Sequence, residues 1–399
     1  MKVLVVGSGG REHALAWAIA RTGDNVEIHA APGNPGIAAL ASCHPARAED
    51  PAAIVPLAAE LGVDLVVVGP EAPLVIGLAD ALRRRGIPVF GPSADAARIE
   101  GSKAFAKDVM EAAGVPTART LSVARPPCVV KADGLAAGKG VWVCRDQAEL
   151  DAALRAAQTL AQPFHVEELL EGPELSVFAI AAGEEAVVLP AARDYKRIGD
   201  GDVGPNTGGM GSFSPVADAP PVDEILETIH RPVLRELAQR GAPFTGCLYA
   251  GLMLTEGGPH VIEFNCRFGD PETQALLPRL NGGLLELLAA ATASELAGVA
   301  SPTASGAAVN VVVASRDYPE RGESGTPIGG LEDAEAADAL VFHAGTALQD
   351  GRVVTNGGRV LNVVGAGESV EEARAAAYAA VAHIDFAGMQ YRTDIAADA

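Results

Sequence analysis

The sequence predicts a multidomain protein of mixed α/β and α+β class, with an N-terminal parallel α/β domain, a hairpin-rich central region and a small C-terminal β-rich domain. Three observations support this fold class. The chain has 399 residues, enough for two to four domains of roughly 100 to 200 residues each. Apolar strands alternate with helices over residues 1–101. Glycine-punctuated strands follow over residues 102–325, and short strands return over residues 326–399.

Residues 1–101 show the alternation that is typical of a parallel sheet covered by helices. The expected strands are 2–6, 26–30, 65–68 and 87–90, and a helix is expected at 11–21. Glycine-containing turns follow several of these strands, at 7–10, 69–70 and 91–92. We therefore expect ligand-facing loops at the carboxyl ends of the strands.

The rest of the chain changes from this alternation to hairpins. In the central region we expect helices at 102–113, 222–239 and 272–280, and strands at 129–131, 141–143, 165–168, 175–181, 186–190, 247–255 and 260–264. In the last domain we expect strands at 341–343, 352–354 and 359–364 and a helix at 370–381. The pattern indicates antiparallel sheets in both parts.

Charge and composition limit the classes of partner. The chain carries 51 acidic and 30 basic residues, a net charge of −21, and this field repels phosphate backbones and anionic lipid surfaces. We therefore expect no nucleic-acid partner and no membrane partner. No apolar run is long enough for a membrane span and no secretion signal is visible, so a cytoplasmic location is expected. The five cysteines contain no CxxC pair, which favours reduced structural thiols.

The segment GSGGRE at residues 7–12 is a weak candidate for an anion site. It joins a strand to a helix, so backbone amides and the positive end of the helix face the loop. A nicotinamide fingerprint would need a third glycine where Glu12 stands, and a carboxylate there opposes a pyrophosphate. A purely structural turn explains the segment equally well.

The segment KADGLAAGKG at residues 131–140 is a stronger candidate for binding phosphate. Lys131 and Lys139 bracket a loop of small residues, which can expose amides to a polyphosphate with an ammonium group on either side. It is not a Walker A loop, because Asp133 and Gly140 stand where that motif needs Gly and Ser or Thr. A solvated hairpin explains the glycines, but not why Lys131 follows an apolar strand.

Glu263, Asn265 and Arg267 form the candidate metal site. Along a strand these three side chains share one face, since successive side chains alternate between faces. The carboxylate and amide oxygens suit magnesium, which would also hold substrate phosphate oxygens. The arginine can bind a carboxylate or a phosphoryl group. An edge strand with a polar outer face is the structural alternative.

Two further segments carry groups that a ligand can use. Residues 165–174 end a strand among acidic residues, where backbone groups can pair with an adenine edge and Glu174 can accept from ribose hydroxyls. A solvated acidic loop explains this segment as well. Residues 193–197 lead into the glycine-rich run at 199–211, which favours backbone that wraps closely around a ligand over disorder.

The segments at 7–17, 129–141, 194–215 and 262–274 together resemble the phosphoribosylamine-glycine ligase family, whose fold is ATP-grasp. The most specific are GDGDVGPNTGGMG at 199–211 and FNCRFGDPETQ at 264–274. The resemblance runs in order from residue 1 to about 395. It implies an ATP-grasp domain over residues 102–325 with two lobes, the small lobe at about 120–190, that hold ATP between antiparallel sheets.

The resemblance also implies the reaction. ATP, glycine and 5-phosphoribosylamine would give glycinamide ribonucleotide, ADP and phosphate, with Mg2+ or Mn2+ as the metal ion. The carboxylate of glycine is a poor electrophile, so its conversion to glycyl phosphate would supply a good leaving group. Glycine and 5-phosphoribosylamine are the expected partners, and a monomer is expected.

Matching the family's motifs to this sequence gives each candidate residue a role. The nucleotide phosphates would contact Lys103, Lys131, Gly138 and Lys139, the last in a closing loop. Adenine and ribose would contact Glu167, Glu168, Leu170 and Glu174. Magnesium would bind Glu263 and Asn265. Asp194 would bind the glycine ammonium, and Arg267 its carboxylate or the acyl phosphate. The phosphoribosylamine would face Gly9, Gly10, Arg11, Pro70 and Glu71.

Three other functions are alternatives. Another ATP-grasp ligase of the purine pathway, such as a carboxylase or a formate-using transformylase, would hydrolyse ATP in response to bicarbonate or formate. A nicotinamide-dependent oxidoreductase would bind NAD(P)H, although the missing third glycine disfavours it. A nucleotide-binding regulator would lack turnover, and the lysines together with Glu263 and Asn265 disfavour that function.

Overall fold

The computed structural model describes residues 1–21, 25–134, 140–160 and 162–399. The strands of the N-terminal domain are β1 (Lys2–Gly7), β2 (Glu27–Pro32), β3 (Ser42–Cys43), β4 (Leu65–Val68) and β5 (Val89–Phe90). They form a parallel sheet in the order β3-β2-β1-β4-β5, which confirms the predicted sheet. Strand β1 is buried from Val3 to Val6, which explains its continuous apolar run. The helices are α1 (Gly10–Ala20), α2 (Pro51–Leu61), α3 (Glu71–Val75), α4 (Leu78–Arg84) and α5 (Ala94–Gly101).

The central region contains two antiparallel sheets. The small lobe is a sheet in the order β7-β6-β8, built from β6 (Cys128–Ala132), β7 (Val141–Cys144) and β8 (Phe164–Glu168), with α7 (Gln147–Thr159) beside it. The large lobe is a sheet in the order β10-β9-β15-β16, built from β9 (Glu174–Ala182), β10 (Glu185–Val188), β15 (Thr245–Thr255) and β16 (Gly258–Asn265). Helix α6 (Lys103–Ala112) leads into the small lobe.

Two predicted helices are interrupted near a proline. Residues 222–239 form α8 (Val222–Ile225), a π-helical turn (Leu226–His230) and α9 (Arg231–Gln239). Residues 272–279 form α10 (Glu272–Leu276) and a 3-10 turn (Leu277–Arg279). Pro232 and Pro278 lie at these junctions, and a proline has no N–H for the regular helical hydrogen bond.

The C-terminal sheet also contains strands from the central region of the sequence. Its order is β11-β14-β17-β22-β19, with β11 (Arg193–Asp194), β14 (Gly211–Ser214), β17 (Ala307–Ala314), β22 (Arg359–Gly367) and β19 (Leu340–His343). A second sheet holds β18 (Glu323–Pro327), β21 (Arg352–Gly357) and β20 (Thr346–Gln349). The other elements of this region are the hairpin of β12 (Arg197–Gly199) and β13 (Val203–Asn206) and the helices α11 (Leu284–Thr292), α12 (Leu331–Ala336) and α13 (Val370–Val381).

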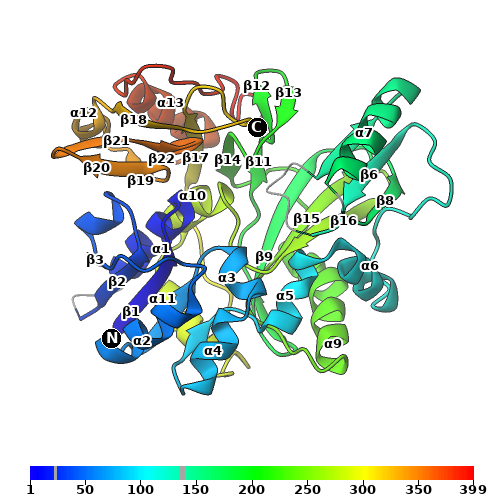
Figure 1. Cartoon of the computed structure of the whole chain (residues 1–399), viewed down its shortest axis with the longest axis horizontal. Coiled ribbons are helices and arrows are strands. Elements are labelled where there is room, and N and C mark those ends of the chain that lie inside the picture. Colours follow the sequence, from blue (N-terminus) through cyan, green and yellow to red (C-terminus); the bar gives the residue numbers. More distant parts are fainter. Residues whose placement is uncertain (22–24, 135–139, 161) are drawn as a thin grey trace.

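Strand β17, the middle strand of this sheet, was not predicted from the sequence. All eight residues of β17 are buried, so its side chains do not alternate between apolar and polar. The predicted domain boundaries at 101 and 325 stay a prediction, and β17, which lies before the second boundary, pairs with β22 beyond it. Figure 1 shows the C-terminal sheets above the N-terminal domain, with the large lobe extending from both toward the small lobe.

The small lobe has a hydrophobic core of its own. Its buried members are Cys128, Val130, Cys144, Leu150, Ala153, Ala157 and Val166. The other two buried clusters each combine side chains from the N-terminal domain, the large lobe and the C-terminal sheet. The small lobe is therefore packed as a separate unit, whereas the rest of the molecule shares its cores. Within the described ranges, every helix falls short of the length and apolar character that a membrane crossing needs.

Glycines around the first turn make room for a buried carboxylate. Glu12 is 2% exposed, and it accepts hydrogen bonds from the backbone of Gly9 and from Nε of Arg11, both at 2.6 Å. A Cβ on Gly69 would lie 2.0 Å from Oε1 of Glu12 and 2.5 Å from its Cγ, and a Cβ on Gly7 would lie 2.5 Å from that Cγ. The turn after β1 and the turn after β4 therefore both depend on the absence of a side chain.

We expect Gly69→Ala to lower the free energy of unfolding by about 1 to 3 kcal/mol, since the new methyl group forces Glu12 out of its hydrogen bonds. Urea unfolding followed by circular dichroism measures this. The matched control is Gly257→Ala, where the nearest atom to a new Cβ is 3.6 Å away. Equal stability of the two variants would contradict the steric argument.

Candidate active site

Two lysines, the buried Lys107 and the half-buried Lys131, share one carboxylate beside the small lobe. Oε2 of Glu167 on β8 lies 2.7 Å from Nζ of Lys131 on β6, and its Oε1 lies 3.1 Å from Nζ of Lys107 on α6. Burial favours the neutral acid, but a hydrogen bond from His165 and the charges of both lysines outweigh it and lower the pKa of Glu167 to about 2. Lys131 also donates to the carbonyl of Ile262 on β16, at 2.9 Å, and so joins the two lobes.

This pairing bears on the predicted adenine hinge. The Glu167 side chain is directed at the lysines, and the Glu168 carboxylate accepts from the backbone and Nε of Arg119, at 2.9 and 2.8 Å. Leu170 and Glu174 are half-buried at the end of this segment. The backbone of residues 167–170 is therefore the part that can meet an adenine edge, and the hinge stays a prediction.

Lys103 begins α6 beside the predicted phosphate loop. Its backbone N–H donates to the carboxylate of Asp133 at 2.6 Å, and its Nζ donates to the carbonyl of Gly134 at 2.9 Å. Burial lowers the pKa of Lys103, while the charges of Glu263 and Asp133 oppose that shift. Lys103 thus lies beside the first residues of the predicted phosphate loop, and the charge of Glu263 acts on it. Gly138 and Lys139 lie outside the described residues.

Glu263 and Asn265 lie two residues apart on β16, and both are half-buried. The amide of Asn265 donates to Oε1 of Glu263 at 3.5 Å. In the described part of the chain, no three His, Cys, Asp or Glu residues gather into a metal-binding group. One carboxylate and one amide oxygen still fit magnesium, because this ion is usually held by one or two protein groups, water and substrate phosphates.

Arg267 lies just beyond β16, between two carboxylates of the N-terminal domain. Its Nε is 3.2 Å from Glu71 and its Nη2 is 2.9 Å from Glu100. Burial disfavours the cation, but these two carboxylates raise the pKa of Arg267. Burial of Glu71 is likewise outweighed by the charges of Arg267 and Arg11, which lower the pKa of Glu71 to about 2. Three predicted site residues, Arg11, Glu71 and Arg267, therefore belong to one ionic network.

Two charged residues of this region, Glu100 and Arg359, were not predicted from the sequence. Glu100 accepts from the backbone N–H of Cys266 at 2.8 Å as well as from Arg267. Arg359 lies 3.4 Å from Asp270 and donates to the Asp270 carbonyl at 2.8 Å. The only signal for Glu100 is an acid at the end of a helix, and Arg359 opens a strand that reads as purely structural. Only the docking of the domains brings these charges together.

The remaining predicted substrate residues lie at the carboxyl ends of β1 and β4. Gly9 precedes α1, and Pro70 precedes α3. Gly10 is buried, and a Cβ there would lie 2.2 Å from the amide nitrogen of Asn362 on β22. Arg11 donates from Nη1 to the carbonyl of Phe268 at 3.1 Å. The N-terminal turn therefore contacts both the segment after β16 and the C-terminal sheet.

A second ionic group is centred on Lys196, which the sequence analysis assigns no role. Its Nζ lies 2.9 Å from Asp194 and also contacts Glu174. Burial disfavours the Lys196 cation, but these two carboxylates raise its pKa. Glu272 accepts from the hydroxyl of Ser176 at 3.2 Å, and burial together with the charge of Asp194 raises the pKa of Glu272 to about 7.

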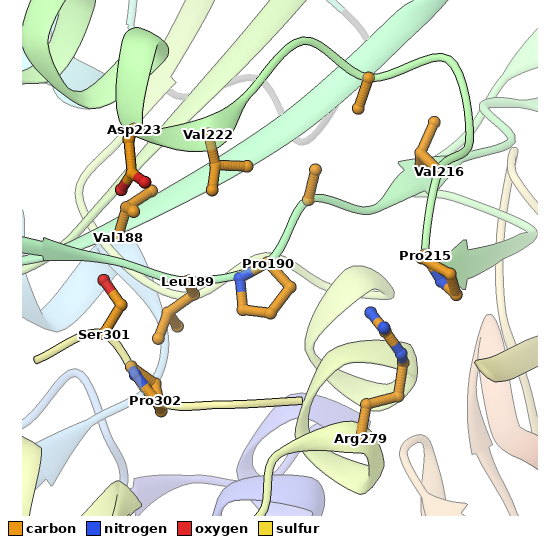
Figure 2. Close-up of a pocket in the computed structure, with 12 residues that line it drawn as sticks. Val188, Leu189, Pro190, Pro215, Val216, Val222, Asp223, Arg279, Ser301 and Pro302 are labelled. Carbon is orange, nitrogen blue, oxygen red and sulfur yellow. The ribbon is translucent and has the colours of Figure 1, made fainter. Parts of the chain in front are cut away.

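A separate cavity of about 310 Å3 contains none of the predicted site residues (Figure 2). Its lining is mostly apolar, and Asp223 and Arg279 are its charged members. Arg279 donates to the carbonyl of Gly306 at 2.9 Å and to the hydroxyl of Ser214. This cavity therefore has no part in the predicted site.

Two antiparallel lobes joined through Lys131, with lysines and carboxylates gathered at their junction, define a protein of the ATP-grasp class. Family models of phosphoribosylglycinamide synthetase match the chain in order. The N domain matches residues 1–100, the ATP-grasp (A) domain 101–273 and the C domain 308–398. The chain therefore belongs to the phosphoribosylglycinamide synthetase family.

Individual proteins show the same likeness over the full length. The chain is 52% identical to the phosphoribosylamine–glycine ligase of Streptomyces coelicolor, covering 100% of this chain and 99% of that one. It is 48% identical to the Corynebacterium ammoniagenes ligase, with 99% and 97% covered. The crystal structure of the Thermotoga maritima ligase superimposes with a TM-score of 0.85 at 36% identity, covering 99% and 100%. A biotin carboxylase from Campylobacter jejuni, at 14% identity and a TM-score of 0.71, shares the fold alone, with 100% and 98% covered.

We expect Glu167→Gln to destabilise the protein by about 3 to 5 kcal/mol, since it leaves the buried Lys107 and the half-buried Lys131 without their carboxylate. The control is Glu168→Gln, whose partner Arg119 has an 81% exposed side chain and whose loss should cost about 0 to 1 kcal/mol. Chemical unfolding measures both.

The pH dependence of the same pair checks the electrostatic cause. The folded pKa of Glu167 lies below its ordinary value of 4.5, so its contribution is present above that pH and is lost as the pH falls toward about 2. The stability difference between wild type and Glu167→Gln should shrink over this window. A difference that stays constant would contradict an ionic origin.

Proposed function

We propose that the chain joins glycine to 5-phosphoribosylamine at the expense of ATP, giving glycinamide ribonucleotide, ADP and phosphate in de novo purine biosynthesis. The observation that carries this proposal is the ordered match of three domain models of one family across the chain. Relatives at about half identity carry the name phosphoribosylamine–glycine ligase. The charged residues at the junction of the lobes supply the groups that such a reaction needs.

The nucleotide is assigned to the junction of the two lobes. Lys103 and Lys131 would contact its phosphates, because both are cations at or beside the predicted phosphate loop. The charge of Glu263 also opposes the lowering of the Lys103 pKa by burial. The separate core of the small lobe is the packing that a lobe closing over ATP requires. The backbone at residues 167–170 would pair with adenine, and Glu174 would meet the ribose.

Glu263 and Asn265 are the residues that would hold Mg2+ or Mn2+. When bound, the ion neutralises the charge that builds on the phosphate oxygens during transfer. Both side chains project from one face of β16, so the chain's own contribution is to present two oxygen donors at a fixed spacing. Arg267 follows two residues after Asn265, just beyond the end of β16.

Activation of the glycine carboxylate is assigned to glycyl phosphate. A carboxylate resists attack by an amine, and transfer of the γ-phosphoryl group to it releases ADP and creates a phosphate leaving group. The amine of phosphoribosylamine then attacks the carbonyl carbon, phosphate departs, and the nitrogen loses a proton. Asp194 would bind the glycine ammonium, and Arg267 would bind the carboxylate and its phosphorylated form.

The second substrate is assigned to the N-terminal domain. Gly9, Gly10, Arg11, Pro70 and Glu71 lie at the carboxyl ends of β1 and β4, where ligands of parallel sheets bind. Arg11 and Glu71 share the ionic network of Arg267, so the amine would arrive beside the activated carboxyl. We also propose that the protein works as a monomer in the cytoplasm.

We expect Glu263→Ala to abolish glycine-dependent phosphate release while leaving the melting temperature near that of the wild type, since Glu263 is half-buried and its loss removes a metal ligand. The control is Glu256→Ala, an exposed acid in the turn after β15. Near-normal turnover of Glu263→Ala at saturating Mg2+ would remove the metal assignment.

The substrates are tested by omission. ADP release should require ATP, glycine and freshly made 5-phosphoribosylamine together, because the acyl phosphate has no acceptor when the amine is absent. Replacing glycine with bicarbonate or formate should give no ADP above background. ADP release driven by either of those ions would favour a different ATP-grasp ligase, and quenching of fluorescence by NAD(P)H would favour an oxidoreductase.

A further inference from the structure

The last residues of the chain form a strap over the β12–β13 hairpin. We use "strap" for residues 392–398. Arg392 is 2% exposed, and its guanidinium bonds to Asp394 at 2.7 Å and to the carbonyl of Arg197 at 3.1 Å. Asp394 in turn accepts from the backbone of Gly201 at 2.8 Å. Figure 1 shows the C-terminus beside β12 and β13.

A second set of bonds fastens the turn of this hairpin. The carboxylate of Asp200 accepts from the backbone of Thr393 at 2.7 Å and from its hydroxyl at 2.5 Å. Asp202 lies 3.4 Å from Arg392. Hydrogen bonds from Arg392 and Gly201 outweigh the effect of burial and lower the pKa of Asp394 to about 2, so this carboxylate is charged at neutral pH.

The strap also holds Tyr195, which lies between Asp194 and Lys196. The phenol oxygen of Tyr195 accepts from the backbone of Ala396 at 2.8 Å, and its hydroxyl donates to Asp398 at 3.2 Å. The Arg392 guanidinium lies 4.9 Å from the centre of the Tyr195 ring, within reach of a cation–π contact. The strap thus contacts the residue that separates the two charged side chains.

At the base of the hairpin, further hydrogen bonds connect the residues held by the strap to the ionic group centred on Lys196. The carbonyl of Lys196 accepts from both the backbone and the hydroxyl of Thr207, each at 2.8 Å. The carbonyl of Tyr195 accepts from Met210 at 2.7 Å. Lys196 itself holds Asp194 and contacts Glu174. Because β13 is largely exposed, the hairpin depends on these polar contacts more than on apolar packing.

The strap is in turn anchored to the C-terminal domain. Arg374 on α13 donates to the carbonyls of Ile395 and Thr393, at 2.9 and 2.7 Å. Tyr378 on α13 donates to the carbonyl of Arg392 at 2.8 Å, and Ile395 is fully buried. A continuous series of contacts therefore runs from α13 through the strap to Lys196.

We propose that the strap is a positioning element for the amino-acid site: it fixes the backbone of residues 194–196, and thereby the affinity for glycine. This inference rests on the proposed function, in which Asp194 binds the glycine ammonium. The strap residues touch no substrate. They act through Tyr195 and the hairpin, which set the direction of the Asp194 and Lys196 side chains. The strap acts on the nucleotide site less directly, through the contact of Lys196 with Glu174, the residue proposed to meet the ribose.

Two variants test the strap independently. Asp394→Asn keeps an oxygen for Gly201 but removes the charge that faces Arg392, and Asp200→Asn weakens the bonds to Thr393. The control is Asp317→Asn, which removes an exposed aspartate–arginine pair with Arg321. Steady-state kinetics give KM for glycine, KM for ATP and kcat, and the melting temperature reports on the fold.

Both strap variants should raise KM for glycine on the order of tenfold, since small displacements of a binding group have large effects. KM for ATP should rise less than KM for glycine, because the strap reaches the nucleotide site only through the contact of Lys196 with Glu174. The parameters of Asp317→Asn should stay within about twofold of the wild type. Unchanged KM for glycine in both variants, or a fall in kcat alone that follows the melting temperature, would overturn the inference. If Asp394→Asn does not fold, Asp200→Asn decides. The wild-type protein distinguishes failure of this inference from failure of the proposed function. If the wild type shows no glycine-dependent ADP release, the proposed function itself is refuted.

Discussion

The half-buried ammonium of Lys131 makes the contacts on which the relative position of the two lobes depends. It is paired with Glu167 in the small lobe and donates to the carbonyl of Ile262 in the large lobe, at 2.7 and 2.9 Å. A buried charge is tolerated only when its hydrogen bonds are satisfied, so the two lobes are held in register at this point. The charge proposed to bind phosphate thus also fixes the position of the small lobe, whose core is otherwise its own.

Strand β16 places the other charges relative to this contact. Its carbonyl at Ile262, its oxygen donors at Glu263 and Asn265, and Arg267 just beyond it follow one another within six residues. The N-terminal domain reaches the end of the strand with Glu71 and Glu100. Because a pleated strand spaces its side chains rigidly, groups from distant parts of the chain meet at fixed separations. On the proposed function, this arrangement would let one strand and the residues just after it serve metal, phosphate and carboxylate chemistry.

Local patterns predicted much of the fold and failed where burial or backbone chemistry overrides periodicity. The parallel sheet of the first domain could be predicted because its strands are apolar runs bounded by glycine turns, and the structure confirms it. Strand β17 was missed because it is buried on both faces, and its side chains show no alternation. The helix expected at 222–239 contains a π-helical turn just before Pro232, a residue that cannot donate the regular bond.

The sequence by itself determined the fold class, the family and the identity of the charged motifs, because strand alternation, glycine turns and spacing along one strand are local properties. Only the tertiary structure decided which charges meet. Glu167 turns to two lysines, Glu100 pairs with Arg267 across 167 residues of sequence, and Asp394 holds the turn at Gly201 across 193. Such pairs form when domains dock and exclude water from their contact, and no local pattern records which distant carboxylate will be there.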